Sequence, residues 1–137
     1  KKDDKITMMF DKMFKMAIKA HKNAYVPYSG FKVGVCLRSE NDNLYIGSNV
    51  ENAAYPQSQC AEASAIGSLI TSGEKKIKEI LVIGGGKGLC TPCGGCRQRL
   101  NEFSSQDTII YLCNSDGLLK TLKFTELLPL SFGPENL

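Results

Sequence analysis

The sequence predicts an α/β fold, a three-layer αβα sandwich with a mixed five-stranded sheet. Segments of helical periodicity alternate with short runs of strand periodicity in the order αββαβαββα. This order favours a mixed sheet with helices on both faces over a helical bundle or a β-sandwich. A length of 137 residues with 42% hydrophobic residues suits one domain that spans residues 1–137.

The first element is an amphipathic helix predicted over residues 4–24, with Asp3 or Asp4 as its cap. Its lysines lie on one face, and its apolar residues recur at spacings of three and four on the other. These apolar residues are Ile6, Met9, Phe10, Met13, Phe14, Ala17, Ala20 and Ala24. The segment 25–30 then breaks the helix, because it contains a proline and ends in a glycine.

A β-hairpin is expected next. Residues 31–38 and 44–50 have the two-residue period of strands, and the polar segment 39–43 between them has the composition of a turn. An irregular loop follows. The later elements are a helix at 60–71, a strand at 77–84, a helix at 93–103, strands at 108–113 and 118–124, and a short helix capped by Thr125 and ended by Pro129.

Composition and charge exclude several classes of protein. The 23% of charged residues is typical of globular proteins, so a disordered or collagen-like chain is excluded. Apolar runs such as Ile80–Ile83 are far shorter than the roughly 20 residues of a membrane helix. The residues Lys12, Lys15 and Lys19 interrupt any apolar stretch that could serve as a signal peptide, so we expect a cytoplasmic protein with no membrane partner.

The net charge of +3 comes from one segment. Residues 1–22 carry seven lysines and three aspartates, and the rest of the chain has 10 basic and 11 acidic residues. The lysines recur at helical spacing and do not cluster with aromatic residues, which favours a solvated helix face over a nucleic-acid-binding surface. We therefore expect no nucleic-acid partner.

Two cysteine groups each begin a predicted helix. Cys60-Ala61-Glu62 begins one, and Pro92-Cys93-Gly94-Gly95-Cys96 begins the next. Free N–H groups and the positive end of the helix dipole stabilise thiolates at these positions. Six cysteines in a chain expected in the reducing cytosol indicate metal binding or catalysis more than disulfides.

The favoured interpretation is an open zinc site. Three thiolates, from Cys60, Cys93 and Cys96, would leave one tetrahedral position for a water that the metal makes acidic. Glu62 would lie beside this water and could pass its proton to a substrate nitrogen.

Other interpretations remain open. Cys90 could complete a closed four-cysteine zinc site in a non-enzymatic module, or the cysteines could bind an iron–sulfur cluster. The pair Cys93 and Cys96 could also act in redox chemistry, since such pairs begin helices too. Pro92 precedes Cys93 and does not follow the last cysteine, which disfavours the common iron–sulfur motif.

The pattern of Cys-Ala-Glu followed about thirty residues later by Pro-Cys-x-x-Cys resembles the signature of zinc-dependent nucleoside and nucleotide deaminases. Three further segments resemble the small homotetrameric cytidine deaminases in particular: Phe31-Lys-Val-Gly34, Asn49 to Tyr55, and Glu126 to Phe132. The resemblance extends from Tyr25 to Phe132 and implies a cytidine deaminase-like fold.

The resemblance also implies an activity. It is the hydrolytic deamination of cytidine and deoxycytidine to uridine and deoxyuridine with release of ammonia, in pyrimidine salvage. Cys60, Cys93 and Cys96 would bind one Zn²⁺ per subunit. Water would attack C4 of cytosine, and Glu62 would carry protons to N3 and to the departing amino group.

Substrate-binding roles follow from the same resemblance. Asn49 and Glu51 would bind the ribose hydroxyls, the Ala61 backbone would bind the pyrimidine edge, and Phe31 would stack on the base. Tyr55 and Phe132 would contact substrate across a subunit interface, in a homotetramer whose pockets are completed by neighbouring subunits. From the residues alone, Phe31 would be assigned to the core, Asn49 to a turn or strand end and Glu51 to solvent.

Several residues are left to explain. The negative charge of three thiolates exceeds the positive charge of one Zn²⁺. Some relatives carry an arginine directly after Cys-Ala-Glu, where this chain has Ala63. We therefore expect Arg97 and helix N–H groups to offset the excess negative charge. His21 is expected at the surface, and Cys36 and Cys113 in the core.

The substrate alternatives within the same class are a modified cytosine nucleoside and cytosine in single-stranded nucleic acid. Action on nucleic acid would need an extended basic and aromatic channel, which the near-neutral body of the chain does not favour.

Overall fold

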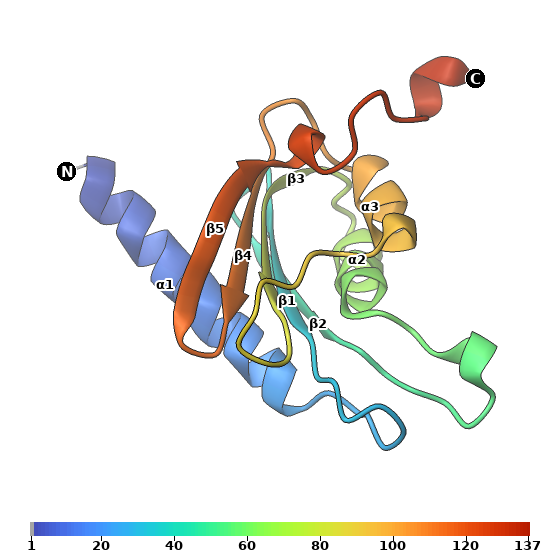
Figure 1. Cartoon of the computed structure of the whole chain (residues 1–137). Coiled ribbons are helices and arrows are strands. Elements are labelled where there is room, and N and C mark those ends of the chain that lie inside the picture. The colour runs from blue at the N-terminus through green and yellow to red at the C-terminus, as the bar shows by residue number, and fades with distance from the viewer. Residues whose placement is uncertain (1) are drawn as a thin grey trace.

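The computed structural model describes residues 2–137 and contains one five-stranded sheet in the order β2-β1-β3-β4-β5 (Figure 1). The helix α1 (Lys2–Lys22) covers one face of the sheet. The helices α2 (Ala61–Thr71) and α3 (Gly94–Asn101) lie on the other face. The predicted three-layer α/β architecture is confirmed.

Strand pairing makes the sheet mixed. β1 (Gly34–Ser39) pairs antiparallel with both β2 (Leu44–Ser48) and β3 (Ile77–Ile83). β3 pairs parallel with β4 (Ile109–Asn114), and β4 pairs antiparallel with β5 (Gly117–Lys123). A parallel pair needs a crossover, and α3 provides it between β3 and β4. α2 and α3 therefore lie side by side on the same face.

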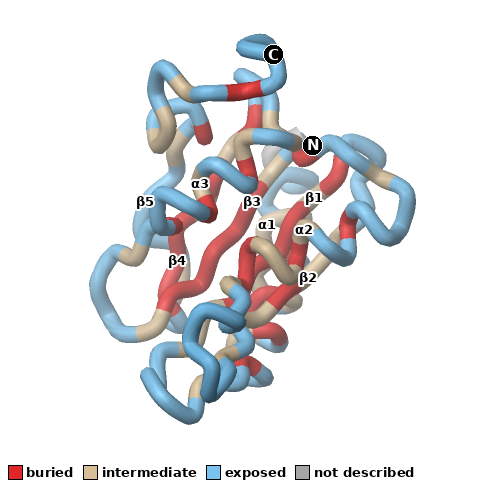
Figure 2. Tube along the Cα trace, turned by 90° about the vertical axis from the view of Figure 1, so that its right-hand side faces the viewer, coloured by how far each residue is buried: buried red, intermediate tan, exposed pale blue. Residues whose placement is uncertain are grey.

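Two buried clusters lie on either side of the sheet, and Figure 2 shows the central strands buried along most of their length. Met13 and Ala17 of α1 pack on one face against Cys36, and Cys113 joins the same cluster, so the predicted burial of both cysteines is confirmed. Leu69 and Leu100 pack on the opposite face. The strand β3 contributes to both clusters, which explains the unbroken apolar run Ile80–Ile83 in its second half.

A glycine allows α2 to approach the sheet closely. A Cβ on Gly47 of β2 would lie 2.5 Å from the Ala61 carbonyl oxygen and 2.9 Å from the Ala65 Cα, both in α2. Any larger residue would therefore displace the helix. This contact is important for the site, because the first turn of α2 carries the Cys-Ala-Glu segment.

Three expectations for the first part of the chain are corrected. The helix α1 already includes Asp4, so Asp4 is not its cap, and the side chain of Asp3 lies outside the described residues. β1 begins at Gly34 and not at residue 31, because the segment before it is bonded to a side chain and not to a strand. His21 is half-buried, and its Nε2 is buried without a hydrogen-bond partner among the described residues, because the end of α1 packs against Gly34.

Near the C-terminus, the helix expected from Thr125 is only a 3₁₀ turn at Phe124–Glu126. Within residues 2–137, no helix is both long enough and apolar enough to cross a membrane.

Candidate active site

The site forms where the N-termini of α2 and α3 meet. Cys60 is the N-cap of α2, where its sulfur accepts a hydrogen bond from the Ala63 N–H at 3.4 Å. Cys93 is the N-cap of α3, and Cys96 follows in its first turn. The parallel crossover places these two helices side by side, so cysteines 36 positions apart in the sequence lie in contact.

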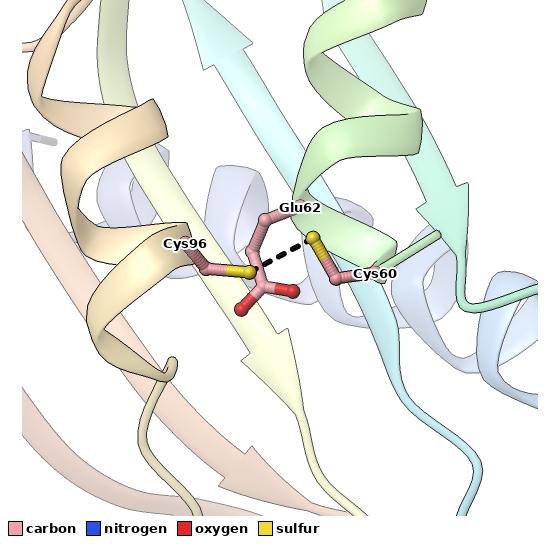
Figure 3. A group of neighbouring side chains, drawn as sticks. All are labelled: Cys60, Glu62 and Cys96. Atoms are coloured by element: carbon pink, nitrogen blue, oxygen red, sulfur yellow. Dashed lines mark hydrogen bonds between the residues drawn. The ribbon is translucent and has the colours of Figure 1, made fainter. Parts of the chain in front are cut away.

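Three side chains converge at this point, as Figure 3 shows: Cys60, Glu62 and Cys96. Their ligand atoms all lie within 4.8 Å of one another, and the Cys96 thiol donates to the Cys60 sulfur at 2.8 Å. Cys96 is 2% exposed and Glu62 is 5% exposed. A buried carboxylate beside two sulfurs cannot be a solvated surface charge, and it needs a chemical reason to be there.

The pKa values of Cys60, Cys96 and Glu62 are shifted in different directions. The hydrogen bond from Cys96, with help from the Ala63 N–H and the charge of Arg99, lowers the pKa of Cys60 to about 6. The same hydrogen bond raises the pKa of Cys96, and burial adds to the effect. Burial also raises the pKa of Glu62. Within this group, Cys60 has the lower thiol pKa, and Cys96 is its hydrogen-bond donor.

The donor set suits zinc. Thiolate sulfur is a preferred zinc ligand, and Cys60 is already prepared for deprotonation. The third predicted ligand, Cys93, is exposed and does not belong to the group of three. Its charge nevertheless acts on Cys96, so the two thiols are close enough to interact. Cys93 as a ligand stays a prediction.

A hollow opens beside this cluster. It has a volume of about 320 Å³, and its lining includes Glu62, Ala61, Asn49 and Glu51. A second hollow of about 330 Å³, beside Tyr55, shares Glu51 and Ser58 with the first. Both volumes lie within the range of small-molecule sites. Cys60 also lines the first hollow, so the structure brings together five of the predicted site residues there.

Asn49 and Glu51 already have protein partners. The Asn49 side chain accepts from the Val33 N–H at 2.9 Å and donates to the Phe31 carbonyl at 2.8 Å. Glu51 accepts from the Ser29 hydroxyl, which lowers the pKa of Glu51, and from the Tyr28 N–H at 2.9 Å. These contacts brace residues 28–33 along the rim of the hollow.

The three predicted aromatic residues are exposed. Phe31 is 43% exposed and packs its ring against Gly85, so it is not the core residue that its strand-like sequence suggested. Tyr55 is 69% exposed and lies beside Tyr28, with ring centroids 5.6 Å apart. Phe132 is 58% exposed, and its carbonyl accepts from Gln98 at 2.9 Å. Neither Phe31 nor Phe132 lines the two hollows.

Arg97 forms three hydrogen bonds around the start of α3. Its Nε and Nη1 donate to the carbonyls of Pro92 and Leu127, both at 2.8 Å, and its Nη2 donates to Thr91 at 3.0 Å. Arg97 therefore fastens the loop before α3 to the C-terminal segment, and none of these three hydrogen bonds is to a thiol. Its role in offsetting the thiolate charge stays a prediction.

Cys90 is also outside the cluster. It packs against Gly84 at the end of β3, where a Cβ on the glycine would lie 3.1 Å from the Cys90 sulfur. Burial raises the pKa of its thiol, and the charge of Glu62 raises it further, so Cys90 is near the site as a neutral thiol.

The comparison with known proteins decides the family. Residues 9–113 match the family described as "Cytidine and deoxycytidylate deaminase zinc-binding region". The chain belongs to the cytidine and deoxycytidylate deaminase family. This family catalyses zinc-dependent hydrolytic deamination, and the cysteine and glutamate cluster of this deaminase is consistent with zinc binding.

Individual relatives agree with this assignment. The deaminase is 37% identical over 130 residues to the cytidine deaminase of Sporosarcina psychrophila, covering 95% of this chain and 96% of the relative. It is 43% identical over 108 residues to that of Mycoplasma genitalium, covering 78% and 82%. The crystal structure of cytidine deaminase from Burkholderia pseudomallei matches it with a TM-score of 0.83 at 35% identity, covering 89% of this chain and 98% of that one.

Sequence reasoning missed some residues of the deaminase site. Ser29 and Ser58 are in loops where serine is ordinary, so nothing in the sequence marked them. Arg99, whose charge reaches Cys60 and Glu62, could have been found, because it lies three positions after Cys96 and hence on the same face of the helix.

Proposed function

We propose that this chain deaminates cytidine and deoxycytidine hydrolytically, giving uridine and deoxyuridine with release of ammonia, in pyrimidine salvage. The observation that carries the proposal is the buried Glu62 carboxylate, which lies within 4.8 Å of two thiol sulfurs on the wall of a nucleoside-sized hollow. Family membership supports the same activity.

Zinc held by Cys60, Cys93 and Cys96 would supply a water acidic enough to attack C4 of cytosine. Glu62 would accept the water proton and deliver it to N3; it would then accept the proton of the hydroxyl group now on C4 and pass it to the amino group, which leaves as ammonia. Burial raises the pKa of Glu62, and a carboxyl group whose pKa lies closer to neutrality both accepts and returns protons efficiently.

The hollow supports a nucleoside substrate. Asn49 and Glu51 would bind the ribose hydroxyls, the Ala61 backbone would bind the base edge, and Phe31 would stack on the base. Asn49, Glu51 and Ala61 line the same hollow as Glu62. A modified cytosine nucleoside is the alternative substrate. Cytosine in a single strand of nucleic acid is disfavoured, since the chain outside residues 1–22 is close to neutral.

We also propose a homotetramer in which neighbouring subunits complete each pocket. Tyr55 and Phe132 are large, exposed aromatic side chains, as residues that contact a partner subunit would be in an isolated chain. We further propose that residues 1–137 form one domain, and that it works in the cytosol, where reducing conditions keep the thiols free for metal.

The test is an ultraviolet assay of cytidine conversion on the zinc-loaded protein, beside Glu62→Ala and Glu62→Gln. Both variants should retain zinc and lose at least about 100-fold in kcat, because proton transfer is lost. A Glu62 variant with full turnover would contradict the assignment. Single-stranded DNA deaminated as fast as free cytidine would contradict the nucleoside proposal.

The variant Cys90→Ser distinguishes the enzyme proposal from the alternative of a closed four-cysteine zinc module. The enzyme proposal expects Cys90→Ser to keep zinc and turnover, because Cys90 packs against Gly84 and is not one of the three proposed ligands. Loss of zinc in Cys90→Ser, with Glu62 dispensable, would favour the structural zinc module.

A further inference from the structure

The proposed zinc site carries an excess of negative charge. Three thiolates outweigh the two positive charges of Zn²⁺, and the Glu62 carboxylate adds another negative charge within 4.8 Å of two of the sulfurs. Half-buried charges of one sign repel one another, so a nearby cation should stabilise the metal-bound site. Arg97 is committed to two backbone carbonyls and a threonine and does not meet this need.

Arg99 is placed to meet it. It lies in the last turn of α3, three residues after Cys96 and therefore on the same face of the helix. Its guanidinium does not extend away from the helix: Nη1 is 3.2 Å from the point where a Cβ on Gly95 would lie. The side chain thus runs back toward the N-terminus of α3, the direction that helical side chains prefer.

The guanidinium ends near the Cys93 thiol. The Cys93 sulfur lies 3.9 Å from the same point at Gly95, so Arg99 and Cys93 border one small space that the glycine leaves open. Among residues 2–137, Arg99 forms no hydrogen bond or ion pair that would hold its guanidinium elsewhere.

We infer that Arg99 is the cation that offsets the excess negative charge of the zinc site, acting as a positioning residue on the Cys93 side of the cluster. The inference rests on the proposed zinc coordination. Arg99 is exposed and lies in the last turn of α3. An arginine at that end of a helix commonly stabilises the helix through its dipole, so its position alone does not indicate a role at the zinc site.

Zinc affinity tests the inference without use of the catalysed reaction. Zinc would be titrated against a chromogenic chelator in the unaltered protein, Arg99→Gln, Arg99→Lys and the control Lys120→Gln. Lys120 is exposed on β5, at the end of the sheet order, so Lys120→Gln removes the same net charge without changing the cluster. Far-UV circular dichroism confirms that each variant is folded.

Arg99→Gln should bind zinc about tenfold more weakly at low salt. Arg99→Lys should recover most of the affinity, and Lys120→Gln should match the unaltered protein. The loss in Arg99→Gln should shrink as the salt concentration rises, because the interaction of an exposed charge is screened. A loss through packing alone would not depend on salt.

Two results would overturn the inference: an Arg99→Gln variant that binds zinc as tightly as Lys120→Gln, or a loss that is equal at all salt concentrations and is not recovered by lysine. These results differ from a failure of the proposed function. An active deaminase with charge-independent zinc binding refutes only the role of Arg99, whereas charge-dependent zinc binding without cytidine turnover refutes only the proposed substrate.

Discussion

At the scale of single residues, two polar side chains of the site both hold the backbone in place and are proposed to bind substrate. Asn49 uses both ends of its amide on the backbone of residues 31–33, and Glu51 accepts hydrogen bonds from residues 28 and 29. The same two side chains are the proposed ribose ligands. A substrate would therefore bind to groups that are already held in place, which reduces the entropy lost on binding.

This double use leads to a prediction for Asn49→Ala. The variant should lose about 1 to 2 kcal/mol in the free energy of unfolding, because the partners of two hydrogen bonds are left unsatisfied. Its KM for cytidine should rise as well. Urea unfolding and steady-state kinetics measure the two effects.

Asn43→Ala is the matched control. Asn43 donates to Glu74 at 2.9 Å, away from the cluster, so its loss should affect stability and leave KM unchanged. Equal KM values for Asn49→Ala and the unaltered protein would contradict the proposed role of Asn49.

At the scale of secondary-structure elements, the site depends on how closely α2 and α3 pack against the sheet. The first turn of α2 carries Cys60, Ala61 and Glu62, and Gly47 of β2 determines how near that turn can come. The cluster is therefore sensitive to packing changes on the strand beneath it.

Gly47→Ala should destabilise the protein by about 1 to 3 kcal/mol, because the added methyl overlaps the backbone of α2. It should also weaken zinc binding by displacing Cys60. Chemical unfolding and chelator competition test both effects.

Gly67→Ala in α2 is the control, because a Cβ there meets nothing within 4 Å. It should stabilise the protein by about 0.5 to 1 kcal/mol, since alanine favours the helix. Unchanged zinc affinity in Gly47→Ala would show that the approach of α2 does not determine the cluster.

A second element-scale feature is the link between the β1–β2 turn and the end of α2. Tyr45 and Asn43 donate to the Glu74 carboxylate and lower its pKa to about 2, from a usual value near 4.5. A carboxyl group whose pKa is lowered by folding stabilises the protein above its unfolded pKa. This contribution should be lost as the pH falls from about 4.5 to about 2.

Urea unfolding of the unaltered protein and Glu74→Gln at several pH values measures this effect. The stability difference between them should be largest at neutral pH and should narrow below about pH 4.5. A difference that stays constant down to pH 2 would show that the Glu74 charge does not contribute.

At the scale of the whole molecule, the proposed assembly makes a prediction about shared pockets. Tyr55 and Phe132 are exposed, and Phe132 lines neither hollow of its own chain. If each pocket is completed by a neighbouring subunit, Phe132→Ala should lower kcat/KM while retaining zinc.

Mixing subunits tests this arrangement. Co-expressed Glu62→Ala and Phe132→Ala subunits should regain activity, because some pockets would combine an intact Glu62 with an intact Phe132. Light scattering should give a mass near four times the 15.0 kDa of the chain. Activity no higher than the average of the two variants measured separately would refute the shared pocket.

The sequence by itself determined the fold class, the order of the elements and the family. These depend on local periodicity and on motifs whose residues lie close together in the chain, such as Cys60-Ala61-Glu62. The predicted start of the first strand was wrong, because the Asn49 side chain, and not a neighbouring strand, bonds the backbone of residues 31–33. A local sequence pattern cannot show that a side chain takes the place of a strand in this way.

Only the tertiary structure decided which residues act together. It brought Cys60 and Cys96 into contact through the side-by-side packing of α2 and α3, bonded Arg97 to the backbone around α3 and laid Arg99 along α3 beside Gly95. Adjacency to Cys96 in the sequence drew attention to Arg97 and not to Arg99. The physical reason is that electrostatic interactions depend on distance in space and on side-chain direction. Two residues that are adjacent in the sequence can differ in both.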